Sequence, residues 1–166
     1  MAAGPPGPGP EHRFLERKIG TWEIEAEYFL GADAEPMLAR GIDRVRALGP
    51  YWVLAESEFE LPGMRIIGQA ATGYDPVSRR YRSTWIDSVT PFLYSFDGSY
   101  DPERGVLELT GVNRDPQSHR DVRYRSEEIF GTEDDRVFEL RVESSPESGN
   151  PGLEIPILRY QYTRRR

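Results

Sequence analysis

Asp87 is the residue whose type and position best fit acid–base chemistry. In residues 79–88, strict alternation places Tyr81, Ser83, Trp85 and Asp87 on one face of a strand. If Trp85 points into an apolar interior, Asp87 does as well, and buried carboxyl groups are common general acids and bases. The other interpretation, which we favour, is a carboxylate at the strand end that accepts hydrogen bonds and fixes the following turn.

Glu56 and Tyr124 are two further candidate catalytic residues. Glu56 falls on the same face of its strand as Trp52, and further apolar residues of the strand fall on the opposite face. Because one face cannot hold all the apolar residues, we expect a bulge or an inverted half there. Glu56 then lies either in a pocket or, as we favour, on the solvent face beyond the bulge. Tyr124 and Glu128 share one face of a later strand, which makes both of them candidate pocket residues.

Arg40 is the best candidate for a cation inside the protein, because it shares a face with two apolar residues. There it would balance Asp87, Glu56 or Glu128. Such a buried charge network serves a purely structural purpose as readily as a functional one.

These residues must be positioned by short strands. Segments rich in aromatic and β-branched residues, bounded by Gly, Pro, Asp and Asn, predict strands at about 21–28, 37–47, 51–60, 64–74, 79–88, 92–100, 105–112, 119–130, 134–144 and 156–164. Nearly the same turn signal occurs at residues 74–76 and 100–102. Since no helical stretch of about 10 to 15 residues separates the strands, we expect an antiparallel meander.

Such a sheet leaves two exposed edges unless it closes, and closure into a barrel removes both. A two-sheet sandwich is the alternative. Aromatic side chains on the proposed inner faces favour an all-β barrel whose interior holds side chains or one small ligand. The residues expected to contact such a ligand are Trp22, Tyr28, Arg40, Trp52, Trp85, Tyr94, Phe96, Tyr124, Glu128 and Tyr160.

The chain before the first strand divides into two parts. Residues 1–10 are almost entirely Gly, Pro and Ala, which predicts a disordered lead, with one barrel domain over residues 11–166. In residues 11–19, Phe14, Leu15 and Ile19 share one face of a short helix that closes an end of the barrel. The polar loop at 144–154 is the longest break between strands.

Composition excludes several classes of partner. The net charge of −7, from 28 acidic and 21 basic residues, makes nucleic acid an unsuitable partner. With no cysteine there are no disulfides, thiolate nucleophiles or thiolate metal sites. No apolar run approaches the roughly 18 residues of a membrane span, and residues 1–10 lack the apolar core of a signal peptide, so we expect a cytoplasmic protein.

The order of several short motifs resembles a bacterial family of calycin-like proteins whose domain has no known function. The motifs are Gly20-Thr21-Trp22, Gly73-Tyr74-Asp75, Trp85-Ile86-Asp87-Ser88, Asp97-Gly98 and Tyr160-Gln161-Tyr162-Thr163-Arg164. The resemblance covers about residues 12–164 and implies a lipocalin-like barrel without an assigned activity. The fatty-acid-binding branch of calycins anchors a carboxylate with Arg-x-Tyr, from which residues 159–162 depart.

Cofactors and metals find few candidate ligands. Another calycin-like branch, the nitrobindins, binds haem through a histidine, but His12 precedes the barrel and His119 has the parity of a charged face. Two separated histidines are too few for zinc, and no phosphate-binding glycine loop is present. We therefore expect no cofactor and no metal ion.

Two functions remain open. The first is a binding module that holds a small, largely apolar molecule, with aromatic walls for affinity and Tyr or Arg groups for orientation. The second is a cofactor-independent isomerase or cyclase that uses Asp87, Glu56 or Tyr124 on an apolar substrate. A third interpretation, without a ligand, is a solidly packed barrel that pairs with a copy of itself as a homodimer.

Overall fold

The computed structural model describes residues 4–31, 33–144 and 149–166. Before the sheet lie a short helix, α1 (Pro10–Leu15), and one turn of 3₁₀ helix, η1 (Glu16–Lys18). Within the described residues ten strands follow: β1 (Gly20–Tyr28), β2 (Met37–Leu48), β3 (Trp52–Leu61), β4 (Met64–Asp75), β5 (Arg80–Asp87), β6 (Tyr94–Asp101), β7 (Val106–Arg114), β8 (Asp121–Phe130), β9 (Asp135–Glu143) and β10 (Glu154–Arg164).

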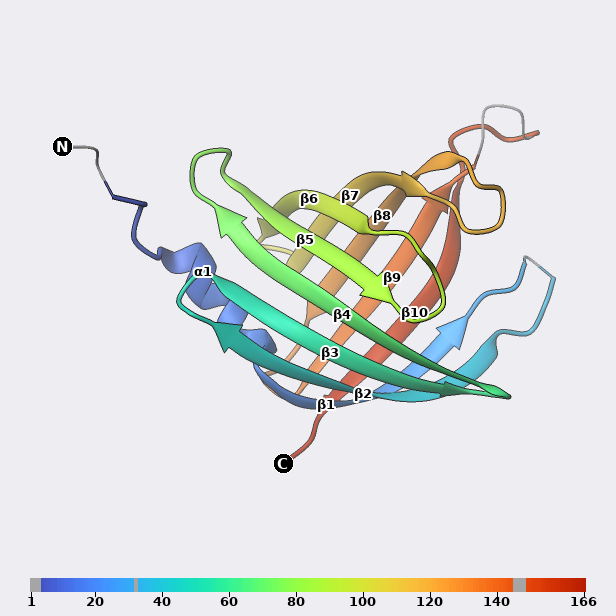
Figure 1. The fold of residues 1–166 in the computed structure, drawn as a ribbon, viewed down its shortest axis with the longest axis horizontal. Coiled ribbons are helices and arrows are strands. Elements are labelled where there is room, and N and C mark those ends of the chain that lie inside the picture. Colours follow the sequence, from blue (N-terminus) through green and yellow to red (C-terminus); the bar gives the residue numbers. More distant parts are fainter. Residues whose placement is uncertain (1–3, 32, 145–148) are drawn as a thin grey trace.

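The sheet closes on itself (Figure 1). Each strand pairs antiparallel with its sequence neighbour, and β1 pairs with β10 from Trp22↔Arg164 to Tyr28↔Leu158. This pairing leaves no free sheet edge. The predicted antiparallel barrel is therefore confirmed, and the two-sheet sandwich is excluded.

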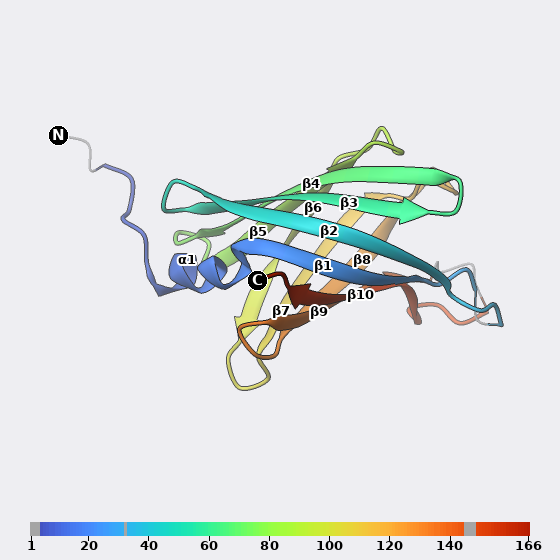
Figure 2. The same cartoon turned by 90° about the horizontal axis from the view of Figure 1, so that it is seen from below.

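The two ends of the barrel differ in how they are covered. The helix α1 lies at one end, which we call the closed end (Figures 1 and 2). Because successive strands alternate in direction, the β1–β2, β5–β6, β7–β8 and β9–β10 connections all lie at the opposite end, which we call the open end. No helix in the described residues is both long and apolar enough to cross a membrane.

Apolar packing holds α1 against the closed end. Leu15 is 1% exposed, and the Phe14 ring lies 4.0 Å from the Tyr100 ring and 4.9 Å from the Phe130 ring, measured between centroids. Trp22 Nε1 donates a hydrogen bond of 2.8 Å to the carbonyl oxygen of Lys18, which fixes the end of η1. The predicted terminal helix is present, although its last turn is 3₁₀.

His12 joins α1 to the barrel by hydrogen bonds. The backbone N–H of Gly9 donates to Nδ1 at 3.0 Å, so the ring proton resides on Nε2. Nε2 then donates to the Tyr74 carbonyl oxygen at 3.0 Å, and the ring is 5% exposed. This histidine therefore has a structural role at the start of α1.

The alternation predicted for β5 is observed, whereas the face assignment in β2 was wrong. Ala39 is buried, but Leu38 is 67% exposed and Arg40 is also exposed, so Arg40 points away from the interior. The inner face of β2 is instead marked by Gly41, where a Cβ atom would come within 2.6 Å of the Phe59 ring. A bulky inward residue at this position would displace that ring.

The expected bulge in β3 was also wrong. Its register with β2 and β4 runs without interruption from Trp52 to Glu60, so Trp52 and Glu56 stay on the outer face throughout. Trp52 is 42% exposed and covers Gly73 of the neighbouring strand, where a Cβ atom would come within 2.5 Å of the indole. An aromatic ring over a glycine stabilises a strand pair from outside the core.

Parts of two predicted segments lie outside the described residues. Residues 4–9 form neither helix nor strand, and residues 1–3 of the predicted lead are outside the description. In the polar loop, residues 145–148 are also outside it, while Ser144 Oγ accepts a hydrogen bond of 3.0 Å from the Leu153 N–H. The division into a disordered lead and one domain stays a prediction.

Truncating Leu15 tests the packing of α1. We expect Leu15→Ala to lower the free energy of unfolding by about 2 to 5 kcal/mol, because it removes buried methyl groups and leaves a void. Leu48→Ala, at a residue 51% exposed, is the matched control and should change it by less than about 0.5 kcal/mol. Equal effects in urea unfolding would show that α1 does not stabilise the barrel.

Candidate functional site

A cavity of about 1010 Å³ occupies the interior and reaches the open end. Its walls are mainly aromatic and aliphatic, with rings from Tyr28, Phe59, Trp85, Phe96, Phe138 and Tyr160. Residues of the β1–β2, β5–β6 and β7–β8 connections and the start of β10 line its entrance. The interior is thus hollow and is accessible from the end opposite α1.

Most of the residues expected inside line this cavity. They are Tyr28, Trp85, Asp87, Tyr94, Phe96, Tyr124, Glu128 and Tyr160. Arg40 and Trp52 lie on the outer surface instead, and Trp22 is buried without lining the cavity. Glu56 is also on the outer surface, the position favoured for it from the sequence. That the residues on the cavity wall bind a ligand stays a prediction.

The deep part of the cavity contains four charged side chains that we call the floor network: Lys18, Asp43, Glu128 and Arg136. Arg136 Nη2 lies 3.1 Å from Asp43 Oδ2, and its Nη1 donates to Glu128 Oε1. Lys18 Nζ lies 2.8 Å from the second oxygen of Glu128. Ser57 Oγ donates to Asp43 Oδ1 at 2.8 Å, so each oxygen of both carboxylates has a partner.

Aromatic rings hold the guanidinium group of Arg136 in place. Its central carbon lies 3.9 Å from the centroid of Tyr162 and 4.5 Å from that of Trp22. Trp22, 1% exposed, therefore supports the floor network from below rather than touching the cavity. Such cation–π contacts favour the charged form of arginine in a desolvated site.

The floor network controls the protonation state of Glu128. Burial alone would raise its pKa, but the adjacent Lys18 and Arg136 outweigh this effect and hold the pKa below its ordinary value. Glu128 is therefore an ionised hydrogen-bond acceptor at neutral pH rather than a proton donor.

The sequence reasoning missed Arg136, Asp43 and Lys18. Arg136 has the parity of Phe138, which lines the cavity, and Asp43 has the parity of the buried Val45. Parity therefore contained a signal for the first two residues. Lys18 had no such signal, because it lies in η1 before the first strand.

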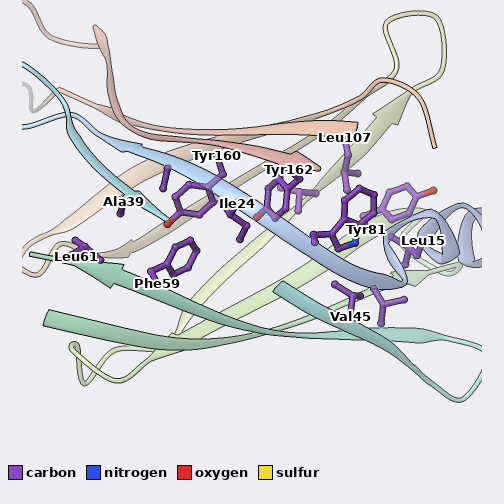
Figure 3. Close-up of a cluster of buried hydrophobic side chains, with 14 residues drawn as sticks. Leu15, Ile24, Ala39, Val45, Phe59, Leu61, Tyr81, Leu107, Tyr160 and Tyr162 are labelled. Carbon is purple, nitrogen blue, oxygen red and sulfur yellow. The ribbon is translucent and has the colours of Figure 1, made fainter. Parts of the chain in front are cut away.

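Tyrosines supply polar groups on the cavity wall. The hydroxyl groups of Tyr28 and Tyr160 lie 3.0 Å apart and share a hydrogen bond. Figure 3 shows the Tyr160 ring beside that of Phe59, with centroids 4.8 Å apart. Burial raises the pKa of Tyr160 well above its ordinary value, so this phenol stays neutral.

Asp87 faces the cavity near the open end, but its oxygens are occupied. Oδ2 accepts a hydrogen bond of 3.0 Å from Trp85 Nε1, and Oδ1 accepts from the N–H groups of Val89 and Thr90 at 3.0 and 2.8 Å. These are the contacts of a carboxylate that fixes the turn after a strand. The structural interpretation favoured from the sequence is therefore present in the molecule.

Tyr124 lines the same part of the cavity, and its hydroxyl group donates to Asp115 Oδ1 at 3.4 Å. Burial is the main cause that raises its pKa, with the nearby Asp115 contributing. Tyr124 is thus a neutral hydrogen-bonding group, which is not the form of a tyrosine that acts as a base.

Neither histidine contributes to the cavity wall. His12 is buried under α1 with both ring nitrogens in hydrogen bonds, and His119 is exposed in the β7–β8 turn with a φ of 57°. Neither is placed to ligate a haem inside the barrel.

The fold and the cavity together define a closed antiparallel barrel with a hollow, mainly apolar interior and a charged floor. The chain belongs to the family described as "Protein of unknown function (DUF1579)", whose model matches residues 7–164. No curated protein matches the sequence.

Two solved structures share the fold at low sequence identity. Rv2717c from M. tuberculosis has a TM-score of 0.69 and 14% identity, with 96% of this chain and 100% of that chain covered. The S-type phycobiliprotein lyase CPES from Guillardia theta has a TM-score of 0.61 and 13% identity, with 93% and 92% covered. At such identities these likenesses show the fold alone.

Removing Arg136 should damage the fold. We expect Arg136→Met to lower the free energy of unfolding by about 3 to 5 kcal/mol, because it leaves Asp43 and Glu128 buried against Lys18 alone. Arg80→Met is the control: Arg80 forms an exposed pair with Asp97, so its loss should cost about 1 kcal/mol or less. A cost for Arg136→Met as small as for the control, measured by urea unfolding, would contradict this account.

Acid should weaken the floor network through Glu128. The pKa of Glu128 in the folded protein is lower than its ordinary value of 4.5. The carboxylate therefore contributes its full stabilisation above about pH 4.5, and this stabilisation is lost as the pH falls through the pKa of the folded protein. Between about pH 7 and pH 3, Glu128→Gln should therefore lose less stability than the unsubstituted protein. Parallel stability–pH curves for the two proteins would show that Glu128 is not coupled to folding.

Proposed function

We propose that this chain binds one small, largely apolar molecule inside the barrel. The observation that carries the proposal is the cavity of about 1010 Å³ with aromatic walls and an entrance at the open end. Pockets for small molecules measure about 300 to 1,000 Å³ and have mainly hydrophobic linings with a few polar groups, so this cavity lies at the upper end of that range.

The wall gives such a ligand both affinity and orientation. Rings such as Phe59, Phe96 and Phe138 offer apolar contact surface that a ligand would remove from water. The hydroxyl groups of Tyr28 and Tyr124 are polar positions near the entrance. A solidly packed structural barrel, the interpretation without a ligand, does not account for this volume.

The phycobiliprotein lyase supports the proposal only through its fold. Its name describes an enzyme for phycobiliproteins, so one barrel of this shape performs chemistry on other molecules. At 13% identity nothing about its substrate extends to this chain.

A cofactor-independent isomerase or cyclase is less well supported. Asp87 does reach the cavity, but its oxygens already accept hydrogen bonds from Trp85, Val89 and Thr90. Glu56 is on the outer surface, and Tyr124 is neutral. The hydrogen bonds to Asp87 are those of a residue that fixes a turn, which favours binding over catalysis here.

We expect the protein to work in the cytoplasm without nucleic acid, metal ion or cofactor, either alone or as a homodimer. Light scattering coupled to gel filtration measures the number of copies. A homodimer would leave the cavity entrance free for a ligand in each copy, provided that the copies meet through the outer faces of their strands.

A dye that fluoresces in apolar surroundings tests the proposal. We expect Nile red, an uncharged dye, to bind with one site per chain, and we expect Leu140→Trp to weaken binding about tenfold or more by filling the cavity from β9. Leu38→Trp adds the same volume on the exposed face of β2 and should bind as the unsubstituted protein does. Absence of saturable binding would overturn the proposed function.

A further inference from the structure

We infer that the cavity selects ligands whose inner end carries an uncharged polar group, and that the net charge of the floor network sets this selection. The inference deepens the proposed function and rests on it. Its elements are the charge balance of the floor, the hydrogen bonds that remain available there, and the charge at the entrance.

The floor network is balanced in charge. Its two cations, Lys18 and Arg136, face the two carboxylates of Asp43 and Glu128, and the side chains of the last three are only 2 to 6% exposed. Both terminal nitrogens of the Arg136 guanidinium are engaged, Nη1 by Glu128 and Nη2 by Asp43. No unmatched cation is left among these four residues to receive an anion.

A carboxylate at the inner end of a ligand would be a fifth buried charge. It would lose its hydration on entering the cavity, and the network offers no unpaired cation to compensate. An alkylammonium group would also lose its hydration, and the network offers no unpaired anion to compensate, because both carboxylates are already paired with cations. An uncharged hydroxyl, amide or carbonyl group needs only a hydrogen bond.

One hydrogen-bond donor is available on the floor. Lys18 lines the cavity with its side chain 13% exposed, and one of the three N–H groups of its ammonium donates to Glu128 Oε2. An oxygen atom of a ligand that accepted a hydrogen bond from this ammonium would be favoured there. Accepting one hydrogen bond requires no charge on the ligand.

The entrance also disfavours anions. Asp87 and Asp115 line the cavity near the open end, and the hydrogen bonds described for their carboxylates come from neutral donors, namely Trp85, Val89, Thr90, Ser118 and Tyr124. Their negative field adds to a net charge of −7 over the chain. An anionic ligand therefore meets repulsion on its path and finds no free cation at its end.

Three ligands with the same alkyl chain test the inference: 1-decanol, decanoate and decylammonium, each used to displace Nile red at neutral pH. We expect 1-decanol to bind at least about tenfold more tightly than either ion. Decanoate or decylammonium binding as tightly as 1-decanol would overturn the inference while leaving the proposed function intact. Failure of Nile red itself to bind would overturn the proposed function.

Variants that change the floor charge provide the sharper test. Glu128→Gln leaves one excess cation on the floor and should shift the decanoate-to-decanol affinity ratio toward decanoate by about tenfold or more. Lys18→Met leaves one excess carboxylate and should shift the decylammonium-to-decanol affinity ratio toward decylammonium. If Glu128→Gln does not fold, Asp43→Asn makes the same change in charge. Glu56→Gln, on the outer face, is the matched control and should change no ratio.

The sign of the shift decides the outcome. A structural network that did not contact ligands would alter stability in these variants but leave the affinity ratios unchanged, and that result would overturn the inference. Ratios that follow the sign of the added charge in both directions would support it, because no general loosening of the fold favours an anion in one variant and a cation in another.

Discussion

The pairing of β1 with β10 is the constraint on which the interior depends, because without it the sheet would have two edges and no enclosed space. Arg164 strengthens this pairing from the end of β10. Its guanidinium group donates to the carbonyl oxygens of Ile19 and Arg17 at 2.6 and 3.1 Å and lies 4.1 Å from the Trp22 ring centroid. The last strand thereby also fixes the helical turn that precedes the first.

The same region connects closure to the floor of the cavity. Trp22 on β1 and Tyr162 on β10 both contact the guanidinium group of Arg136 on β9. The floor network therefore has its geometry only once β1, β9 and β10 are adjacent. Barrel closure and the organisation of the floor network are therefore coupled.

Sequence patterns predicted the strands well where one face is clearly apolar. In β1, buried Trp22 and Ile24 alternate with exposed glutamates, and in β8 the inward face of Tyr124 and Glu128 followed from the same rule. The rule failed in β2 and β3, where large apolar side chains such as Leu38 and Trp52 lie outside. There the inner face is marked by glycine and small residues beside large rings, a signal that depends on the neighbouring strand.

The site was only partly predictable for a related reason. Alternation identifies which residues point inward, but Arg136 and Asp43 are paired across 93 positions of sequence, and nothing local relates them. The sequence alone therefore suggested that an inward carboxylate needs a cation and assigned Arg40, the wrong one. Which charges meet inside a barrel depends on strand order and register together, and both become known only with the closed structure.

A charged floor is not the most stabilising way to close an apolar cavity. Well-packed hydrophobic residues of similar volume often replace a buried ion network at no loss of stability, whereas removal of one member of a network is expensive. The four floor residues must therefore be present as a set, while wall residues such as Leu140 and Phe96 have no polar group that needs a partner. The two parts of the site are thus held together differently: the floor by paired buried charges, and the wall by apolar packing.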